Sequence, residues 1–172
     1  MVILFCGIPG SGKTTIAKRL AKRLQTAGRV KIFISDKLKP PVYQKFFRLL
    51  KENIKRYDFL IFDATFYKTQ WRQKMKTLAK GEKVITVYLS CSLKTALERN
   101  KKRRPRIPEK AVHIISSQMA KPKTPDIILN TEAISIADAV NKVFNAVLKM
   151  KKKDAVLPHA ASRRAHTPFR YV

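Results

Sequence analysis

Acidic residues are scarce in this sequence. Eleven Asp and Glu stand against 38 Lys and Arg, which gives a formal net charge of +27, and the segment from Lys149 onward contributes only +6 of it. A basic C-terminal segment therefore does not account for the charge. A domain this basic attracts polyanions, and nucleic acid is the commonest polyanion in a cell. The other interpretation is a solvated lysine-rich surface around a site for a small phosphorylated substrate.

Cysteines and long apolar runs are also few. The two cysteines, Cys6 and Cys91, are too few for a disulfide framework and suit a reducing compartment. No apolar run approaches the ~18 residues of a membrane span, and the first residues lack the basic leader of a signal peptide. We therefore expect a cytoplasmic protein without a membrane partner. Its hydrophobic content of 45% is enough for a folded core.

Short apolar runs alternate with helical patterns along the chain. Runs typical of buried strands are expected at residues 2–6, 31–35, 59–63, 84–89 and 127–129. Helical patterns lie between them, which predicts an α/β fold: a three-layer sandwich with a five-stranded parallel sheet and helices on both faces. The last helix is expected at 135–150. We expect one domain over 1–152, and a mobile basic C-terminal tail over 153–172.

The clearest motif is a glycine-rich loop directly after the first predicted strand. The glycines of such a loop let backbone N–H groups converge on phosphate oxygens, and the following helix adds its positive N-terminal end. Lys13 is expected to reach the β- and γ-phosphates and the Thr14 hydroxyl to bind Mg²⁺. The loop predicts a site for ATP with Mg²⁺, with GTP as the alternative. Its nucleotide-binding residues are Gly7, Ile8, Pro9, Gly10, Ser11, Gly12, Lys13, Thr14 and Thr15.

Two acidic residues follow the second and third predicted strands, Asp36 and Asp63. The carboxyl ends of parallel strands meet at the crevice where such sheets bind ligands. Asp63 suits a role in holding Mg²⁺ through water, together with Thr14. Asp36 is placed to accept a proton from an acceptor hydroxyl or to orient it. Either residue could instead cap a helix, and the sequence leaves open which of the two contacts the metal.

A basic stretch follows the fourth strand and its helix, with five cations within residues 101–106. Mobile arginines that close over a transferred phosphoryl group stabilise its charge and exclude water. We therefore expect a lid near 99–107, in which Arg99 and Arg103 act in catalysis with Lys13 and Asp36. A solvated basic loop is the alternative.

With these residues assembled, the chain resembles the P-loop kinases that include L-seryl-tRNA(Sec) kinase, its Elongator-associated relatives, polynucleotide kinases and adenylylsulfate kinase. The resemblance covers about residues 1–150. It rests on the acid after the second strand, the Asp-Ala-Thr-Phe-Tyr segment at 63–67 with the Arg72 that follows, the lid, and the segment 125–131. One departure is Lys39, where the seryl-tRNA kinase has an arginine. The resemblance implies a P-loop NTPase fold with the kinase-type strand order 2-3-1-4-5.

The predicted function is transfer of the γ-phosphoryl group of ATP to a hydroxyl of an RNA or nucleotide acceptor. Two alternatives stay open: a small-molecule kinase of the adenylylsulfate type, and an RNA-binding ATPase switch that phosphorylates nothing. The sequence does not indicate an oligomeric state.

Overall fold

The computed structural model describes residues 1–156, with side chains to Lys152. Apart from the last turn of the final helix, the predicted tail over 153–172 lies outside the described residues. Strands and helices alternate in the order β1 (Val2–Cys6), α1 (Lys13–Leu24), β2 (Val30–Ile34), η1 (a 3₁₀ helix, Ser35–Lys37), α2 (Val42–Asn53), β3 (Phe59–Asp63), α3 (Thr69–Leu78), β4 (Val84–Ser90), α4 (Leu93–Lys101), α5 (Glu109–Ser117), β5 (Ile127–Asn130) and α6 (Ile136–Val156).

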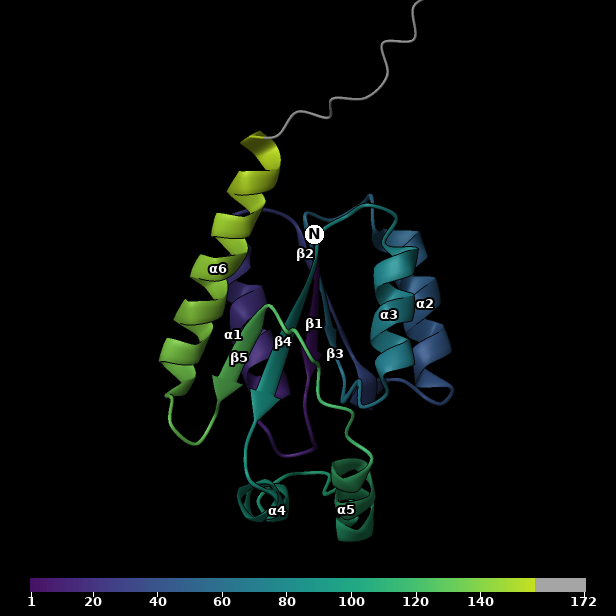
Figure 1. Ribbon diagram of the computed structural model, residues 1–172, viewed down its shortest axis with the longest axis vertical. Coiled ribbons are helices and arrows are strands. Elements are labelled where there is room, and N and C mark those ends of the chain that lie inside the picture. Colours follow the sequence, from purple (N-terminus) through teal and green to yellow (C-terminus); the bar gives the residue numbers. More distant parts are fainter. Residues whose placement is uncertain (157–172) are drawn as a thin grey trace, which may run out of the picture.

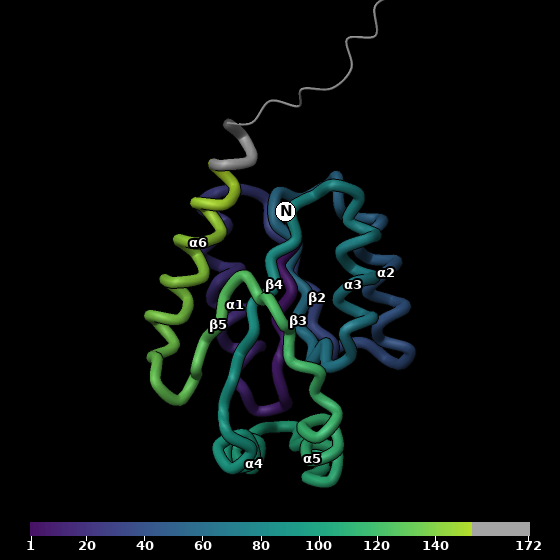
Figure 2. Tube along the Cα trace, viewed as in Figure 1, coloured from purple at the N-terminus to yellow at the C-terminus, as the bar shows by residue number. Residues whose placement is uncertain are grey.

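The five strands form one parallel sheet in the order β2-β3-β1-β4-β5. This confirms the predicted fold class and strand order. Helices α1 and α6 cover one face of the sheet and α2 and α3 cover the other, while α4 and α5 lie beyond the carboxyl ends of the strands (Figure 1). The tube view shows the same three layers and the same separate position of α4 and α5 (Figure 2).

The alternating side chains of β1 explain why its sequence is continuously apolar. Ile3 and Phe5 belong to the core under α1 and α6. Val2, Leu4 and Cys6 belong to the core under α2 and α3. All five are fully buried, because a central strand of a covered parallel sheet has no solvent face. This central strand delivers the chain directly into the glycine-rich loop.

Some element boundaries differ from the predicted ones. The second strand ends at Ile34, and a short 3₁₀ helix over Ser35–Lys37 follows it, which the sequence pattern did not indicate. The final helix continues to Val156, because lysine and alanine favour helix after the apolar periodicity has ended. Among the residues described, no helix combines the length and apolar character needed to cross a membrane.

Candidate active site

The glycine-rich loop joins β1 to α1 and contacts α4, the helix that leads into the predicted lid over 99–107. Gly10 has φ 84°, and a Cβ atom added there would overlap the backbone carbonyl of Ala96 in α4. Glycine is therefore required twice at this position, for the left-handed backbone and for the close approach of α4. At Gly10 the loop and α4 therefore touch backbone to backbone.

Lys13 lies inside the loop. Its side-chain amine donates hydrogen bonds to the Ile8 carbonyl (2.8 Å) and to Ser11 Oγ (3.4 Å), and the residue is only 7% exposed. Burial lowers the pKa of Lys13, and the nearby Asp63 carboxylate opposes that effect. A cation that has lost its water in this way gains from a bound anion, because burying a charge is costly unless it is paired.

Asp63 ends β3 and lies beside the start of α1. It accepts a hydrogen bond of 2.5 Å from the Thr14 hydroxyl and is 2% exposed. Burial raises the pKa of Asp63, against the opposing effects of Lys13 and of the Thr14 hydrogen bond. A buried carboxylate next to a hydroxyl is an oxygen donor set that suits Mg²⁺.

A metal at this point would depend on its nucleotide for most of its ligands. Within residues 1–156 no group of three or more His, Cys, Asp or Glu side chains could hold an ion. Mg²⁺ commonly binds one or two protein oxygens together with substrate phosphates and water. Thr14 and Asp63 fit that arrangement.

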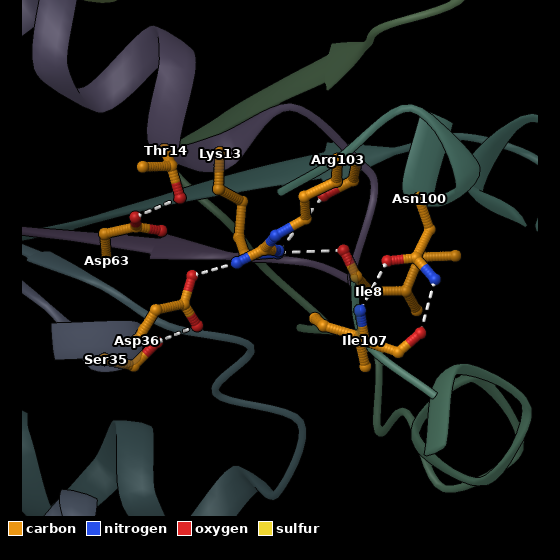
Figure 3. A network of polar contacts seen from close by, with 10 residues as sticks. Ile8, Lys13, Thr14, Ser35, Asp36, Asp63, Asn100, Arg103 and Ile107 are labelled. Carbon is orange, nitrogen blue, oxygen red and sulfur yellow. Dashed lines mark hydrogen bonds and ion pairs between the residues drawn. The ribbon is translucent and has the colours of Figure 1, made fainter. Parts of the chain in front are cut away.

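Asp36 and Arg103 approach each other across the mouth of the loop. Arg103 donates a hydrogen bond from its guanidinium to Asp36 Oδ2, and this ion pair joins the residues after β2 to the segment after α4 (Figure 3). Asp36 lies in the 3₁₀ helix, and α2 has Pro41 as its N-cap while α3 has Lys68. Neither Asp36 nor Asp63 therefore caps one of these helices.

Arg99 lies elsewhere in the site. Its guanidinium donates to the Thr131 hydroxyl (2.9 Å) and to the Thr131 carbonyl (2.8 Å), so it is fixed to the loop after β5. Glu132 in the same loop accepts hydrogen bonds from the Ser92 amide (3.1 Å), the Ser92 hydroxyl (2.8 Å) and the Thr95 hydroxyl. These contacts attach both the start and the end of α4 to the β5–α6 loop.

A cavity of about 630 Å³ connects these groups. Of the predicted residues, Gly10, Gly12, Lys13, Thr14, Thr15, Asp36, Arg99 and Arg103 line it, whereas Gly7, Ile8, Pro9, Ser11 and Asp63 do not. Arg104 and Pro105 of the predicted lid line it as well. Sequence reasoning missed further lining residues: Ile16, Lys18, Ile34, Lys37, Thr131, Ile134 and Ile136. The partly exposed Ile136 (42%) was beyond prediction, because only the fold shows that an isoleucine after β5 borders a cavity.

The segment after Asp63 is braced from two sides. Phe66 has a left-handed φ of 44°, which is uncommon for a bulky residue. Its amide donates to the Tyr43 hydroxyl (3.1 Å), and its carbonyl accepts from Arg72. Arg72 also donates to the Ala120 carbonyl (2.8 Å), so it connects this segment to the chain after α5. Buried Arg72 thus holds backbone rather than lining the cavity.

Comparison with known proteins gives one family and several relatives. The model of the AAA domain family matches residues 2–125. An L-seryl-tRNA(Sec) kinase from Methanococcus maripaludis is 27% identical over 84% of this chain and 65% of its own length. The chain thus matches slightly less than two thirds of that relative.

Two further similarities extend the comparison. A probable adenylyl-sulfate kinase from Halalkalibacterium halodurans is 26% identical over 83% of this chain and 80% of its own length. The crystal structure of a gluconokinase from Sinorhizobium meliloti superposes with a TM-score of 0.72 at 17% identity, over 90% of this chain and 95% of that one. The last similarity concerns the fold alone.

Proposed function

Since this chain belongs to the AAA domain family, within its P-loop kinase relatives, we propose that it is an ATP-dependent kinase acting on a hydroxyl of an RNA or nucleotide. We further propose residues 1–152 as the catalytic domain and 99–107 as its lid. The reaction forms a bond between the acceptor oxygen and the γ-phosphorus and breaks the bond from that phosphorus to the bridging oxygen of ADP. The hydroxyl proton leaves to a base or to water.

In this proposal the glycine-rich loop and α1 hold the triphosphate. Lys13 moves its amine from the Ile8 carbonyl to the phosphate oxygens, where it balances their charge. Thr14 and Asp63 hold Mg²⁺, which when bound neutralises phosphate charge and fixes the orientation of the triphosphate. The apolar side chains of Ile134 and Ile136, which line the cavity together with Arg99, suit the flat face of a base.

Asp36 and Arg103 act at the acceptor side. The Asp36 carboxylate orients the acceptor hydroxyl or takes its proton, and the Arg103 guanidinium stabilises charge on the transferred group. The ion pair between them is the single observation that carries the proposal. It holds an acid and a lid cation over a buried Lys13, and the pKa of that lysine senses both charges.

The distribution of charge supports an RNA acceptor. With 38 Lys and Arg against 11 Asp and Glu, most cations cannot pair with an acid. Many exposed cations lie on the segments that follow β2 and β3 and on the stretch between β4 and β5, and two of them, Lys37 and Arg104, line the cavity. The exposed cations of these segments include Lys37, Lys39, Lys68, Lys101, Lys102, Arg104, Arg106, Lys121 and Lys123. A backbone of phosphates binds such a surface through release of counterions.

An adenylylsulfate-type kinase is the second candidate. It is favoured by the adenylyl-sulfate kinase relative, which aligns over 80% of its own length, more than the seryl-tRNA kinase does. A small anionic nucleotide would also meet Lys37 and Arg104, which line the cavity.

Incubation with γ-labelled ATP and, in separate reactions, total RNA, nucleosides or adenylylsulfate tests the proposal. Label in RNA or in nucleosides supports it, and label in adenylylsulfate alone assigns the second candidate. Phosphate release without any labelled acceptor overturns both in favour of an ATPase switch. Lys13→Ala is the control in each reaction, because contaminating kinases would not respond to it.

A further inference from the structure

The basic loop, residues 101–106 with Lys101 as the last residue of α4, is closed at its base by one buried side chain. Asn100 is 1% exposed and contacts both backbone polar groups of Ile107. Its amide nitrogen donates to the Ile107 carbonyl (2.7 Å), and its amide oxygen accepts from the Ile107 N–H (3.2 Å). The paired bonds fix a distance and an orientation between the end of α4 and the start of α5 (Figure 3).

This loop needs such a tie because of its composition. Five of its six residues are Lys or Arg, and like charges so close together repel one another. Ion pairs offset two of the five cations: Arg103 with Asp36, and Arg106 with Glu109. Closing a loop also costs conformational entropy, which the hydrogen bonds of a buried amide can offset.

We propose that Asn100 is a positioning residue for the lid arginines. By holding Ile107 it sets where Arg103 and Arg104 stand above the glycine-rich loop. The proposal rests on the proposed function, because it gives Arg103 a part in phosphoryl transfer. It goes beyond that function in assigning the placement of Arg103 to an amide that touches neither nucleotide nor acceptor.

Removing the amide should therefore lower turnover more than nucleotide binding. We expect Asn100→Ala to reduce kcat by about 10- to 100-fold, the cost of misplacing a catalytic group by about an ångström. The affinity for ATP should change by less than about 3-fold, since Lys13 and the glycine-rich loop are untouched. Asn100→Asp keeps the acceptor for the Ile107 N–H and loses the donor to its carbonyl, so it provides a near-isosteric second variant.

Asn53→Ala is the matched control. Asn53 is also a buried asparagine, 9% exposed, but its amide donates to Leu49 within α2, away from the lid. A loss of kcat in both variants would mean that any buried asparagine matters for folding, and would overturn the proposal.

A double-mutant cycle with Arg103→Ala separates positioning from general stability. If Asn100 acts through Arg103, then Asn100→Ala in the Arg103→Ala background should change kcat by less than about 3-fold. The same fold-loss in both backgrounds would overturn the proposal.

Limited trypsin digestion tests the tie without relying on activity. The loop offers several Lys and Arg cleavage sites, and a tied loop is cut slowly. Asn100→Ala should speed cleavage within 101–106, well below the melting temperature, while Asn53→Ala should not. Unchanged cleavage overturns the tie, whether or not the protein labels an acceptor. If the wild type labels no acceptor at all, the proposed function fails while the digestion still decides the role of Asn100.

Discussion

The two edges of the sheet use charge in opposite ways. Where the strands begin, charged side chains pair with each other: Arg29 and Lys151 lie 3.7 and 3.8 Å from Asp58, and Lys55 lies 3.4 Å from Glu82. Where the strands end, Lys13 and Asp63 are buried, and burial disfavours the charged form of each side chain. The charges at the first edge are paired near the surface. At the other edge Asp36 is also paired, with Arg103, whereas the buried charges of Lys13 and Asp63 would gain from a bound ligand.

One aspartate at each edge, Asp58 where the strands begin and Asp63 where they end, shows this contrast most directly. The backbone N–H of Arg29 lowers the pKa of Asp58, because it stabilises the ionised form. Burial raises the pKa of Asp63 despite Lys13 nearby. The fold therefore favours the charge on Asp58 and opposes the charge on Asp63, which is typical of residues held in place for chemistry.

The largest expected effect on turnover comes from removing Lys13, and removing Lys55 at the other edge provides the comparison. Lys13→Ala should lower turnover by ~10²-fold or more, because it removes a cation from the transferred phosphate. Lys55→Ala should leave turnover within about 2-fold and cost at most about 1 kcal/mol of stability, since an exposed ion pair contributes little. Steady-state kinetics and thermal melts measure both. Wild-type turnover in a folded Lys13→Ala protein would contradict a phosphate role for the loop.

The two site aspartates should separate by role. Asp63→Asn should raise the Mg²⁺ concentration needed for half-maximal rate by about 10-fold, as for the loss of a group that orients metal ligands. Asp36→Asn should lower transfer while nucleotide affinity stays nearly constant. Mg²⁺ titrations and ATP binding decide this, with Asp58→Asn as the control at the other edge. Equal losses of ATP binding in both site variants would refute this division of roles between Asp63 and Asp36.

Salt should weaken RNA binding, and only cations at the edge where the strands end should contribute to this salt dependence. Contact with about five phosphates predicts a log–log slope near −3.5 on a single strand. Replacing Lys101 and Lys102 by alanine should make the slope shallower by about 1.4. The same change at Lys55 and Arg56 should leave it unaltered. RNA affinities between low and physiological salt measure the slopes; no binding at physiological salt would favour the small-molecule kinase.

The smallest effect is a difference in melting temperature. Ionising a carboxyl whose folded pKa is raised removes stability as pH rises through that pKa, so Asp63→Asn should raise Tm by a few degrees at neutral pH. A lowered pKa contributes stability above the ordinary pKa, which is lost as pH falls, so Asp58→Asn should slightly lower Tm. Below about pH 4 both differences should shrink. Thermal melts of both variants from pH 3 to 8 measure these changes in Tm. A change of the same sign in the two variants at neutral pH would contradict the contrast.

The fold was predictable because its signals are local. The continuous apolar run of β1 is typical of a strand buried on both faces, and the loop that follows identifies the edge where the site lies. The strand-end acids were predictable for the same reason, since parallel strands bring their carboxyl ends together.

What the sequence did not indicate depends on contacts between distant segments. No local pattern says that Arg99 contacts Thr131 while Arg103, four residues later, contacts Asp36. The same holds for Asn100, whose spacing to Ile107 is unremarkable until the fold buries it. Such roles follow from the packing of α4 and α5 beyond the sheet.

The backbone contact between Gly10 and Ala96 couples the shape of the glycine-rich loop to the position of α4. At Gly10 no side chain lies between the loop and the backbone of Ala96, so no change of rotamer can absorb a displacement of either there. The width of the glycine-rich loop and the position of α4 are therefore a single geometric variable. Any substitution that enlarges residue 10 would displace α4 as well, and its effect would be felt at residues that it does not touch.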